Sequence, residues 1–412
     1  MRREGLPAWS LFAGLIAAAG LPIYIHAPKA YADLHGVGLG ALGAALFGLR
    51  LLDFVQDPAL GWLAERARAR RGASVALAAA LMAAGMVGLF LPTPPIAPLA
   101  WFALTLAVVF SAFSYLTIVF YAQGVAKAGQ LGPGGHLRLA TWREAGALGG
   151  ICLAAVAPAA LGVVTTVPFA VFAGIFAALA LIAVLAMRRE WVGPVGAAMP
   201  PTPFRAILAD RPARRLLALA LVNAAPVAVT STLFLYYVES GLAAPGWEGP
   251  LLLLFFLSAA VSVPLWGRGA ARFGVRRMLA AGMILAILSF GWAAVLGAGD
   301  VGAFAVICAL SGAALGADMT LMPAIFARRL AVIAPGAGAA FGLWSFVSKF
   351  TLAFAAVALL PLLEARGFAP GLENPQAALD MLALLYAVLP CALKVLAVAV
   401  LMTTPIEDEA KP

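Results

Sequence analysis

The sequence predicts an all-α membrane protein whose twelve transmembrane helices form two six-helix bundles. Three observations support this prediction: an extreme apolar composition, twelve segments long enough to cross a bilayer, and a loop motif repeated in the two halves. Of the 412 residues, 64% are hydrophobic and 11% are charged, and the mean hydropathy is +1.01. A water-soluble fold cannot bury so much apolar surface, so a bilayer must solvate most of the chain.

The second observation is the number and length of the apolar segments. A helix needs about 20 mostly apolar residues to cross the hydrocarbon core. Suitable segments are residues 8–26, 38–64, 74–92, 98–125, 140–164, 167–187, 213–238, 249–267, 278–297, 301–326, 337–363 and 379–402. We therefore expect an N-terminal bundle over 1–187, a cytoplasmic linker over 188–212, a C-terminal bundle over 213–402 and a cytoplasmic tail over 403–412.

Basic residues set the predicted orientation. With the N-terminus in the cytoplasm, the outer loops hold only Lys29 and Arg366, whereas the inner loops and tails hold nearly all other lysines and arginines outside the spans. Cytoplasmic loops carry such an excess of basic residues, so we expect both termini on the cytoplasmic side of the cell inner membrane. The net charge of +9 lies in short loops rather than on a soluble basic face, so no nucleic-acid partner is expected.

Signatures of soluble enzymes are missing from the sequence. It contains no Walker loop, no dinucleotide fingerprint and no metalloprotease histidine pair. The cysteines lie in separate apolar runs and the histidines lack metal-ligand spacing; these residues are Cys152, Cys308, Cys391, His26, His35 and His136. We expect a monomeric protein without enzymatic activity or cofactor, whose partners are the lipid bilayer and a small-molecule substrate.

The third observation is the repeated loop. GWLAERARARRG at Gly61–Gly72 follows the second segment, and GRGAARFGVRR at Gly267–Arg277 follows the eighth. Such a duplication places a substrate site near the membrane midplane between the two halves. The first copy resembles the Gly-x-x-x-Asp-Arg signature of the major facilitator superfamily, with Glu65 at the acidic position. Ala271 takes that position in the second copy.

Ionisable residues inside the spans point to the function, because each costs about 2.5–3.5 kcal/mol at a helix centre. They are Arg50, Asp53, Asp57, Arg143, Glu144, Asp318, Lys349 and Lys394. Arg50, Asp53 and Asp57 share one helix face, which should point into the bundle. Two carboxylates one turn apart suit a hard cation, and Pro58 frees a backbone carbonyl one turn earlier. The alternative is a structural ion pair between Arg50 and Asp53.

The other membrane charges allow several readings. Lys349 needs an anionic partner, and the aspartate pair of the second segment is the candidate; an incoming cation would then compete with Lys349. With Arg50 included, however, the two cations already balance the two aspartates. Arg143 either joins a site or snorkels as an interfacial anchor. Asp318 is a gating or packing carboxylate, and Lys394 is expected to snorkel.

Four stretches share a resemblance to one family. RLLDFVQDPALGWLAERARARRG resembles the helix-two signature of the glycoside-pentoside-hexuronide:cation symporters, and YADLHGVGLGALG, TWREAGALGG and the lysine of WSFVSKF resemble further parts of that family. The resemblance implies that Asp53, Asp57 and Ser114 bind a coupling cation and that Lys349 is the counter-ion. It also implies that Tyr24, Tyr121 and Arg143 approach the substrate.

The chain departs from that family at two positions. Where sugar-carrying members have aspartates in helices one and four, this chain has Ala17 and Thr117. We expect a sodium- or proton-coupled symporter of a sugar or other small solute that works by alternating access, with Thr117 in the rebuilt substrate site. The alternative is an efflux carrier or a transporter of lysolipids and other amphipaths on the same fold. A third hypothesis, a membrane sensor or assembly factor that does not transport, is less favoured because such a protein should carry appended soluble domains.

Overall fold

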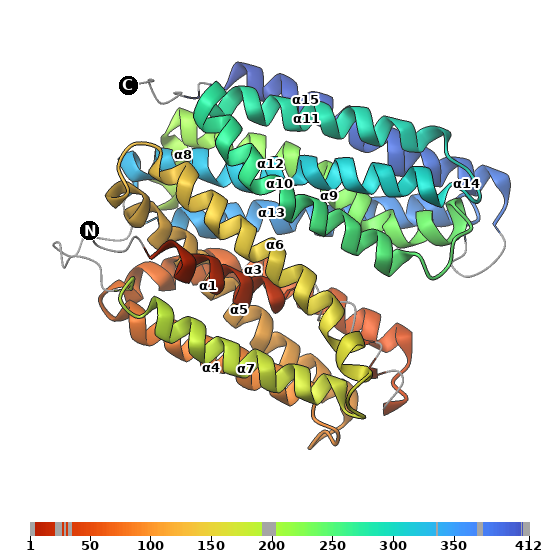
Figure 1. The fold of residues 1–412 in the computed structure, drawn as a ribbon. Coiled ribbons are helices and arrows are strands. Elements are labelled where there is room, and N and C mark those ends of the chain that lie inside the picture. Colours follow the sequence, from red (N-terminus) through yellow and green to blue (C-terminus); the bar gives the residue numbers. More distant parts are fainter. Residues whose placement is uncertain are drawn as a thin grey trace. The chain divides into compact units, whose positions relative to one another are not determined.

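Helices are the only regular secondary structure in the described part of the chain (Figure 1). The structure is a computed structural model that describes residues 5–20, 27–28, 30–31, 35–191, 203–334, 337–368, 374–404 and 406. The chain forms two units. Unit 1 comprises Met1–Ile207 with Ala327–Phe346, and unit 2 comprises Leu208–Phe326 with Val347–Pro412. The all-helical prediction is confirmed for these residues.

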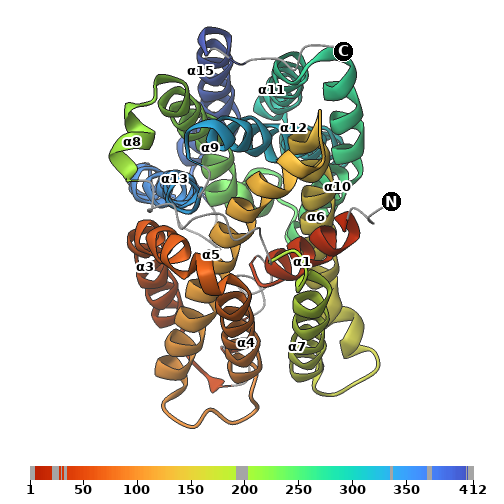
Figure 2. The ribbon, with the colours of Figure 1, turned by 90° about the vertical axis from the view of Figure 1, so that its left-hand side faces the viewer.

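Unit 1 contains the helices of the first half. They are α1 (Leu6–Ala18), α3 (Leu39–Arg66), α4 (Arg71–Leu89), α5 (Pro98–Gln130), α6 (Gly135–Gly162) and α7 (Pro168–Met187), with the 3-10 turn η1 (Ala67–Arg70) between α3 and α4. α1, α5 and α7 have a proline in the first turn, where no helical N–H is lost. α1 packs along α6, α3 packs on α5, and α4 packs on α5 and α7 (Figures 1 and 2).

Small residues allow α1 and α6 to approach closely. A Cβ atom on Gly146 would overlap the carbonyl oxygen of Ser10, and one on Gly150 would overlap the carbonyl oxygen of Gly14. Both pairs have a spacing of four residues, the small-xxx-small pattern that lets membrane helices pack backbone to backbone. By contrast, a Cβ on Gly149 would meet no atom within 4 Å. The glycine spacing on α6 therefore selects the face that α1 covers.

Unit 2 contains most helices of the second half. They are α9 (Arg211–Tyr236), α10 (Glu248–Phe273), α11 (Val275–Trp292), α12 (Val301–Ile333), α13 (Gly338–Glu364), α14 (Gln376–Ala383) and α15 (Leu389–Thr403), of which α12 and α13 also contribute residues to unit 1. Two π-helices, η2 (Tyr237–Gly241) and η4 (Leu384–Val388), and the 3-10 turn η3 (Ala293–Val295) interrupt them. The rings of Tyr237 and Tyr386 stack with centroids 4.1 Å apart in the core.

The lengths and compositions of the helices agree with a multi-pass membrane protein. Nine stretches among the described helices are long and apolar enough to cross a bilayer, and α1 is a shorter apolar helix. The predicted first span continues into residues 21–26, which lie outside the described residues. The count of twelve spans and the cytoplasmic position of the termini therefore stay predictions.

The start of the predicted linker is fixed to unit 1. Glu190 accepts a hydrogen bond from Trp9 Nε1 at 3.2 Å and forms an ion pair with Lys127 Nζ at 2.8 Å. Its carbonyl oxygen accepts a hydrogen bond from Gln123 Nε2 at 2.6 Å. The linker continues with the short helix α8 (Phe204–Ala209), and α9 begins at Arg211, within the predicted linker. The exact domain limits stay a prediction.

Candidate functional site

Two buried aspartates on α3 form the centre of the first candidate site. Asp53 is 3% exposed and Asp57 is 0% exposed. They lie one helical turn apart, so both side chains project from the same face. This is the inward-facing stripe that their spacing predicts. Because an isolated carboxylate is costly to bury, the surrounding groups decide what these two can bind.

Asp53 has polar neighbours from its own helix and from α5. Its Oδ1 atom accepts a hydrogen bond from Gln56 Nε2 at 3.0 Å and a long one from Ser114 Oγ at 3.5 Å. Ser111 Oγ in turn donates to Gln56 Oε1 at 2.8 Å. The predicted ligand Ser114 thus lies beside Asp53, within a chain of polar groups that links α3 to α5.

Asp57 has its neighbour on α13. Its Oδ2 atom accepts a hydrogen bond from Ser345 Oγ, and Ser345 belongs to the Ala327–Phe346 segment of unit 1. The backbones also approach closely, since a Cβ on Gly342 would lie 2.9 Å from the carbonyl oxygen of Asp57. We call Asp53, Gln56, Asp57, Ser111, Ser114 and Ser345 the carboxylate cluster.

Oxygen atoms dominate the carboxylate cluster. Hard cations take carboxylate, hydroxyl and carbonyl oxygens as ligands, and Pro58, inside α3, leaves the carbonyl of the preceding turn without its helical donor. No group of three histidine, cysteine or acidic side chains among the described residues is suited to a metal ion. The oxygen-rich set of groups in the cluster fits a hard cation.

The acidic residue of the loop motif contacts the start of α13. Glu65 is 7% exposed, and its Oε1 atom accepts a hydrogen bond from the backbone N–H of Ala339 at 3.0 Å. A carboxylate at a helix N-terminus satisfies an unpaired N–H group and opposes the positive end of the helix dipole. Glu65 and Asp57 therefore hold the same helix at points two turns apart on α3.

A second group of polar residues lies between α5 and α6. Arg143 and Glu144 are 4% and 1% exposed, and their side chains pair with Nε and Oε1 2.7 Å apart. Tyr121 Oη donates to the same Glu144 oxygen at 2.9 Å, and the guanidinium carbon lies 3.7 Å from the centre of the Tyr121 ring. We call Thr117, Tyr121, Arg143 and Glu144 the arginine cluster. Arg143 does not snorkel, because Glu144 and Tyr121 hold it inside.

Two atoms of the arginine cluster lack a hydrogen-bond partner. Thr117 Oγ1 and Arg143 Nη2 are both buried and have none among the described residues. Buried polar atoms are nearly always satisfied in native proteins, so each exception needs an explanation. Ser114, Thr117 and Tyr121 follow one another along α5 at steps of three and four residues, which aligns the arginine cluster with the carboxylate cluster on one stripe.

The predicted contacts of the other candidate site residues are not tested by the described part of the chain. Tyr24 and the side chain of Arg50 lie outside what the structure describes, so their roles and the Arg50–Asp53 ion pair stay predictions. Lys349 lies on α13, one turn beyond Ser345, in the part of that helix that belongs to unit 2. Its pairing with the aspartates also stays a prediction.

Lys394 differs from its prediction. It is only 3% exposed, and its ammonium group contacts Asp318 Oδ2 and, at 2.7 Å, Asn223 Oδ1. The snorkelling expected of Lys394 is therefore wrong, because a buried carboxylate on another helix holds the ammonium group inside the bundle.

Sequence reasoning missed several neutral polar partners. They are Gln56, Ser111, Asn223 and Ser345. Two of them carried a usable signal: Gln56 lies three residues after Asp53, and Ser345 lies four residues before Lys349, both on a shared helix face. Ser111 and Asn223 carried none, because a single neutral polar residue is common in membrane helices.

The sequence comparison with known families is decisive. A family described as MFS/sugar transport protein, of the major facilitator superfamily, matches residues 9–408. The chain belongs to this family. The match does not single out the glycoside-pentoside-hexuronide:cation symporters, and a comparison with curated proteins finds no match.

Solved structures show that this family member has the major facilitator fold. A bacterial homologue of the iron transporter ferroportin, in an outward-facing state, has a TM-score of 0.73 at 15% identity and covers 96% of this chain and 98% of its own. A bacterial homologue of ferroportin in an outward-facing state with soaked iron has a TM-score of 0.71 at 16% identity and covers 98% of this chain and 99% of its own. The human organic anion transporter MFSD10 (TETRAN) has a TM-score of 0.69 at 15% identity and covers 97% of this chain and 98% of its own. At these identities the likeness shows the fold alone.

Proposed function

We propose that the protein is a cation-coupled symporter that carries a sugar or another small solute by alternating access, as glycoside-pentoside-hexuronide:cation symporters do. The observation that carries this proposal is the carboxylate cluster. Two almost fully buried aspartates within a membrane bundle are costly, and hydroxyl and amide groups that are able to orient a bound cation lie beside them. A sodium ion or a proton would offset part of this cost.

In this proposal Asp53, Asp57 and Ser114 bind the coupling cation, and Ser345 and Gln56 orient the two carboxylates. Lys349 and Arg50 act as counter-ions. Ser345 and Lys349 lie four residues apart on α13, and residues at this spacing share a helix face. Loading of the cation would then release Lys349 from competition for the aspartates, since an unbalanced buried charge is penalised.

The arginine cluster is the proposed substrate site, together with Tyr24. Thr117 Oγ1 and Arg143 Nη2 supply a buried hydroxyl and a buried donor that have no partner among the described residues. The aromatic ring of Tyr121 lies against the Arg143 guanidinium and packs on Phe341. This combination of one apolar surface with a few convergent polar groups is typical of sites for small polar solutes.

An efflux carrier or a lysolipid transporter is the second candidate. Ala17 and Thr117 replace the acidic residues expected of a sugar site, and the unpaired donor of Arg143 suits an anionic head group. The similarity to the human organic anion transporter is compatible with this candidate through the shared fold.

We also propose that twelve transmembrane helices form two bundles, over 1–187 and 213–402. The protein would lie in the cell inner membrane as a monomer, with both termini in the cytoplasm. The basic loops support this orientation. A thiol label introduced at Arg70 should react only from the cytoplasmic side, and reaction from outside would overturn the topology.

The test of the coupling site is direct cation binding to the purified full-length protein. Radioactive sodium retained in equilibrium dialysis, and protons released or taken up in weak buffer, are measured for the wild type, Asp57→Asn and Asp380→Asn. Asp380 is an exposed carboxylate on α14 and serves as the matched control. We expect Asp57→Asn alone to lower cation affinity by about tenfold or more, the equivalent of about 1.4 kcal/mol.

Transport then separates the two candidates. Proteoliposomes are screened with sugars and lysolipids under imposed sodium and proton gradients. Gradient-driven accumulation supports the symporter, and its loss in Asp57→Asn assigns the coupling. Accumulation that survives Asp57→Asn refutes the proposed coupling site, and gradient-driven release of lysolipids favours the second candidate.

A further inference from the structure

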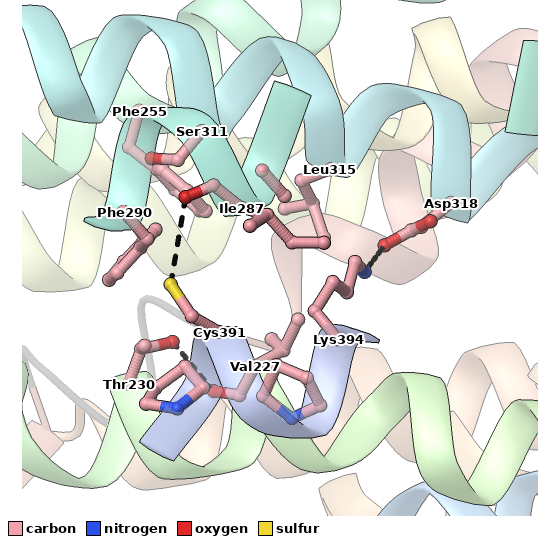
Figure 3. Close-up of a pocket in the computed structure, with 13 residues that line it drawn as sticks. Val227, Thr230, Phe255, Ile287, Phe290, Ser311, Leu315, Asp318, Cys391 and Lys394 are labelled. Carbon is pink, nitrogen blue, oxygen red and sulfur yellow. Dashed lines mark hydrogen bonds and ion pairs between the residues drawn. The ribbon is translucent and has the colours of Figure 1, made fainter. Parts of the chain in front are cut away.

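Three helices of unit 2 bring polar side chains together around Lys394. Lys394 lies on α15, Asp318 on α12 and Asn223 on α9, and all three are buried. The ammonium group forms an ion pair with Asp318 Oδ2 and donates to Asn223 Oδ1 at 2.7 Å. Figure 3 shows Lys394 and Asp318 facing each other at one end of a cavity. This trio is separate from both clusters of unit 1.

The trio is poorly explained as a stabilising device. Burying two charges costs several kcal/mol per ion, and an apolar pair of similar volume is often as stable. Moreover, Asp318 Oδ1 is buried and lacks a hydrogen-bond donor within the described ranges. A group placed only for stability would have both carboxylate oxygens satisfied. The unsatisfied oxygen marks a position that is prepared to accept a proton or a donor.

The cavity next to the trio is small and mostly apolar. Its volume is about 50 Å³, and its apolar walls include Phe255, Ile287 and Leu315. The hydroxyl groups of Thr230 and Ser311 donate to helix carbonyls at 3.1 and 2.7 Å, which leaves Lys394 as the charged donor among the residues that line the cavity. A single water needs about 10–15 Å³ of such volume. The cavity therefore has room for a few waters or one small ion.

The helices around the cavity are irregular where they line it. Pro226 and Pro390 are both lining residues. Pro226 lies inside α9, where it removes the backbone hydrogen bond to the preceding turn, and Pro390 lies in the first turn of α15. The π-helix η4 directly precedes α15, and π-turns are frequent at functional sites. In membrane proteins, interrupted helices are tolerated where they line a cavity and often form ion or substrate sites.

Charge balance limits what the trio is able to bind. The pair of Asp318 and Lys394 is neutral as it stands, so an added cation alone or an added anion alone would leave one net charge in a low-dielectric bundle. A proton and a monoanion together leave none. We propose that Asp318, Lys394 and Asn223 form a second binding site, in which one proton on Asp318 and one small monoanion on Lys394 bind together.

The binding step is a proton transfer followed by an exchange of partners. Hydronium gives its proton to the Asp318 carboxylate, which forms an O–H bond and leaves water. The neutral carboxylic acid no longer balances the ammonium group of Lys394, which stays bonded to Asn223 and takes the anion in its place. Release reverses both events. Asp318 acts as an internal anion that occupies Lys394 whenever the site is unloaded.

Few other groups near the cavity titrate. Of its lining residues, α12 and α15 contribute Asp318, Lys394 and Cys391, whereas the residues of α9, α10 and α11 are not titratable. Cys391 Sγ is 3.6 Å from the carbonyl oxygen of Ile287, to which it points as a weak donor. Asp318 is thus the one carboxylate among these lining residues, and a pH dependence of anion binding is assigned to it.

Thiocyanate is a suitable probe, because it is a small monoanion whose nitrile stretch absorbs where proteins are transparent in the infrared. The bound band is measured for the full chain in lipid nanodiscs across a pH series. For the wild type we expect affinity to rise on acidification, by up to about tenfold for each pH unit, since one proton binds with each anion. Asp318→Asn should bind thiocyanate at every pH, and Lys394→Met should not bind it.

The controls separate this site from misfolding and from the site in unit 1. Lys127→Met removes the lysine that pairs with Glu190 in unit 1 and should keep the wild-type pH dependence. The wild-type titration needs no substitution, so it tests whether a proton and an anion bind together even if Asp318→Asn fails to fold. Thiocyanate binding without a pH slope, binding retained in Lys394→Met, or binding governed by sodium at constant pH would each overturn the proposal. Because thiocyanate binding requires no sugar or lysolipid, its outcome is independent of the symport tests.

Discussion

Gly61 is the position on α3 where a single methyl group should separate that helix from the start of α13. A Cβ atom on Gly61 would lie 2.8 Å from the carbonyl oxygen of Gly338, 3.2 Å from Gly342 Cα and 3.3 Å from Ala339 Cα. Two of these three contacts are between carbon atoms, for which optimal separations are about 3.5–4.0 Å. Gly61→Ala therefore forces the backbones apart by several tenths of an ångström.

The expected cost follows from this overlap. Adding a methyl group to a well-packed contact typically costs about 1–3 kcal/mol, which corresponds to about a 5–150-fold change in an equilibrium. The hydrogen bonds from Ala339 to Glu65 and from Ser345 to Asp57 lie on the same contact. We expect both to be populated less, and the segment around Ala340 to leave α3 more often.

Alkylation of a cysteine introduced at Ala340 measures this opening, because Ala340 is 0% exposed. If opening and closing are fast, the labelling rate follows the population of the open form and should rise about 5–150-fold in Gly61→Ala. Gly48→Ala on the same helix is the control, since a Cβ there meets no atom within 4 Å. Equal labelling rates in the two variants would refute the packing argument.

Two further predictions concern unit 1, both read as thermal unfolding midpoints in detergent. Gly150→Ala should lower the midpoint because its Cβ overlaps the Gly14 carbonyl. Gly149→Ala, whose Cβ meets nothing within 4 Å, should leave the midpoint unchanged or raise it. A lower midpoint for Gly149→Ala than for Gly150→Ala would contradict the α1–α6 packing. Tyr121→Phe should cost about 1.5–3 kcal/mol, the worth of a hydrogen bond to a charged group. The control is Tyr236→Phe in unit 2, a half-buried tyrosine on α9 whose ring packs on Phe368, and it should cost less; an equal loss in both would contradict the hydrogen bond from Tyr121 to Glu144.

The two aspartates of the carboxylate cluster were predictable from local sequence. Asp53 and Asp57 are one turn apart in an apolar segment, so they had to share a face, and burial of that face was the inexpensive arrangement. The acidic position of the loop motif likewise identified Glu65 in advance. Its partner did not follow from the motif, because Ala339 lies in a part of the chain that only folding brings next to α3.

The predictions failed or stopped where the partner comes from a distant segment. Lys394 was expected to snorkel because a lysine near a helix end usually reaches the membrane surface, but Asp318, 76 positions away in sequence, holds it inside. Asn223 was missed for the same reason. A lone polar residue shows its role only through the group that it meets.

The sequence by itself determined that this chain is a multi-pass helical membrane protein, because apolar length and composition have a single physical solution in a bilayer. It also determined which charges had to be explained, since each one in a span is costly. Only the tertiary structure decided which charge pairs with which, and which oxygen is left without a donor. Pairing depends on contacts between helices that are far apart in the chain, and no local pattern of residues encodes those contacts.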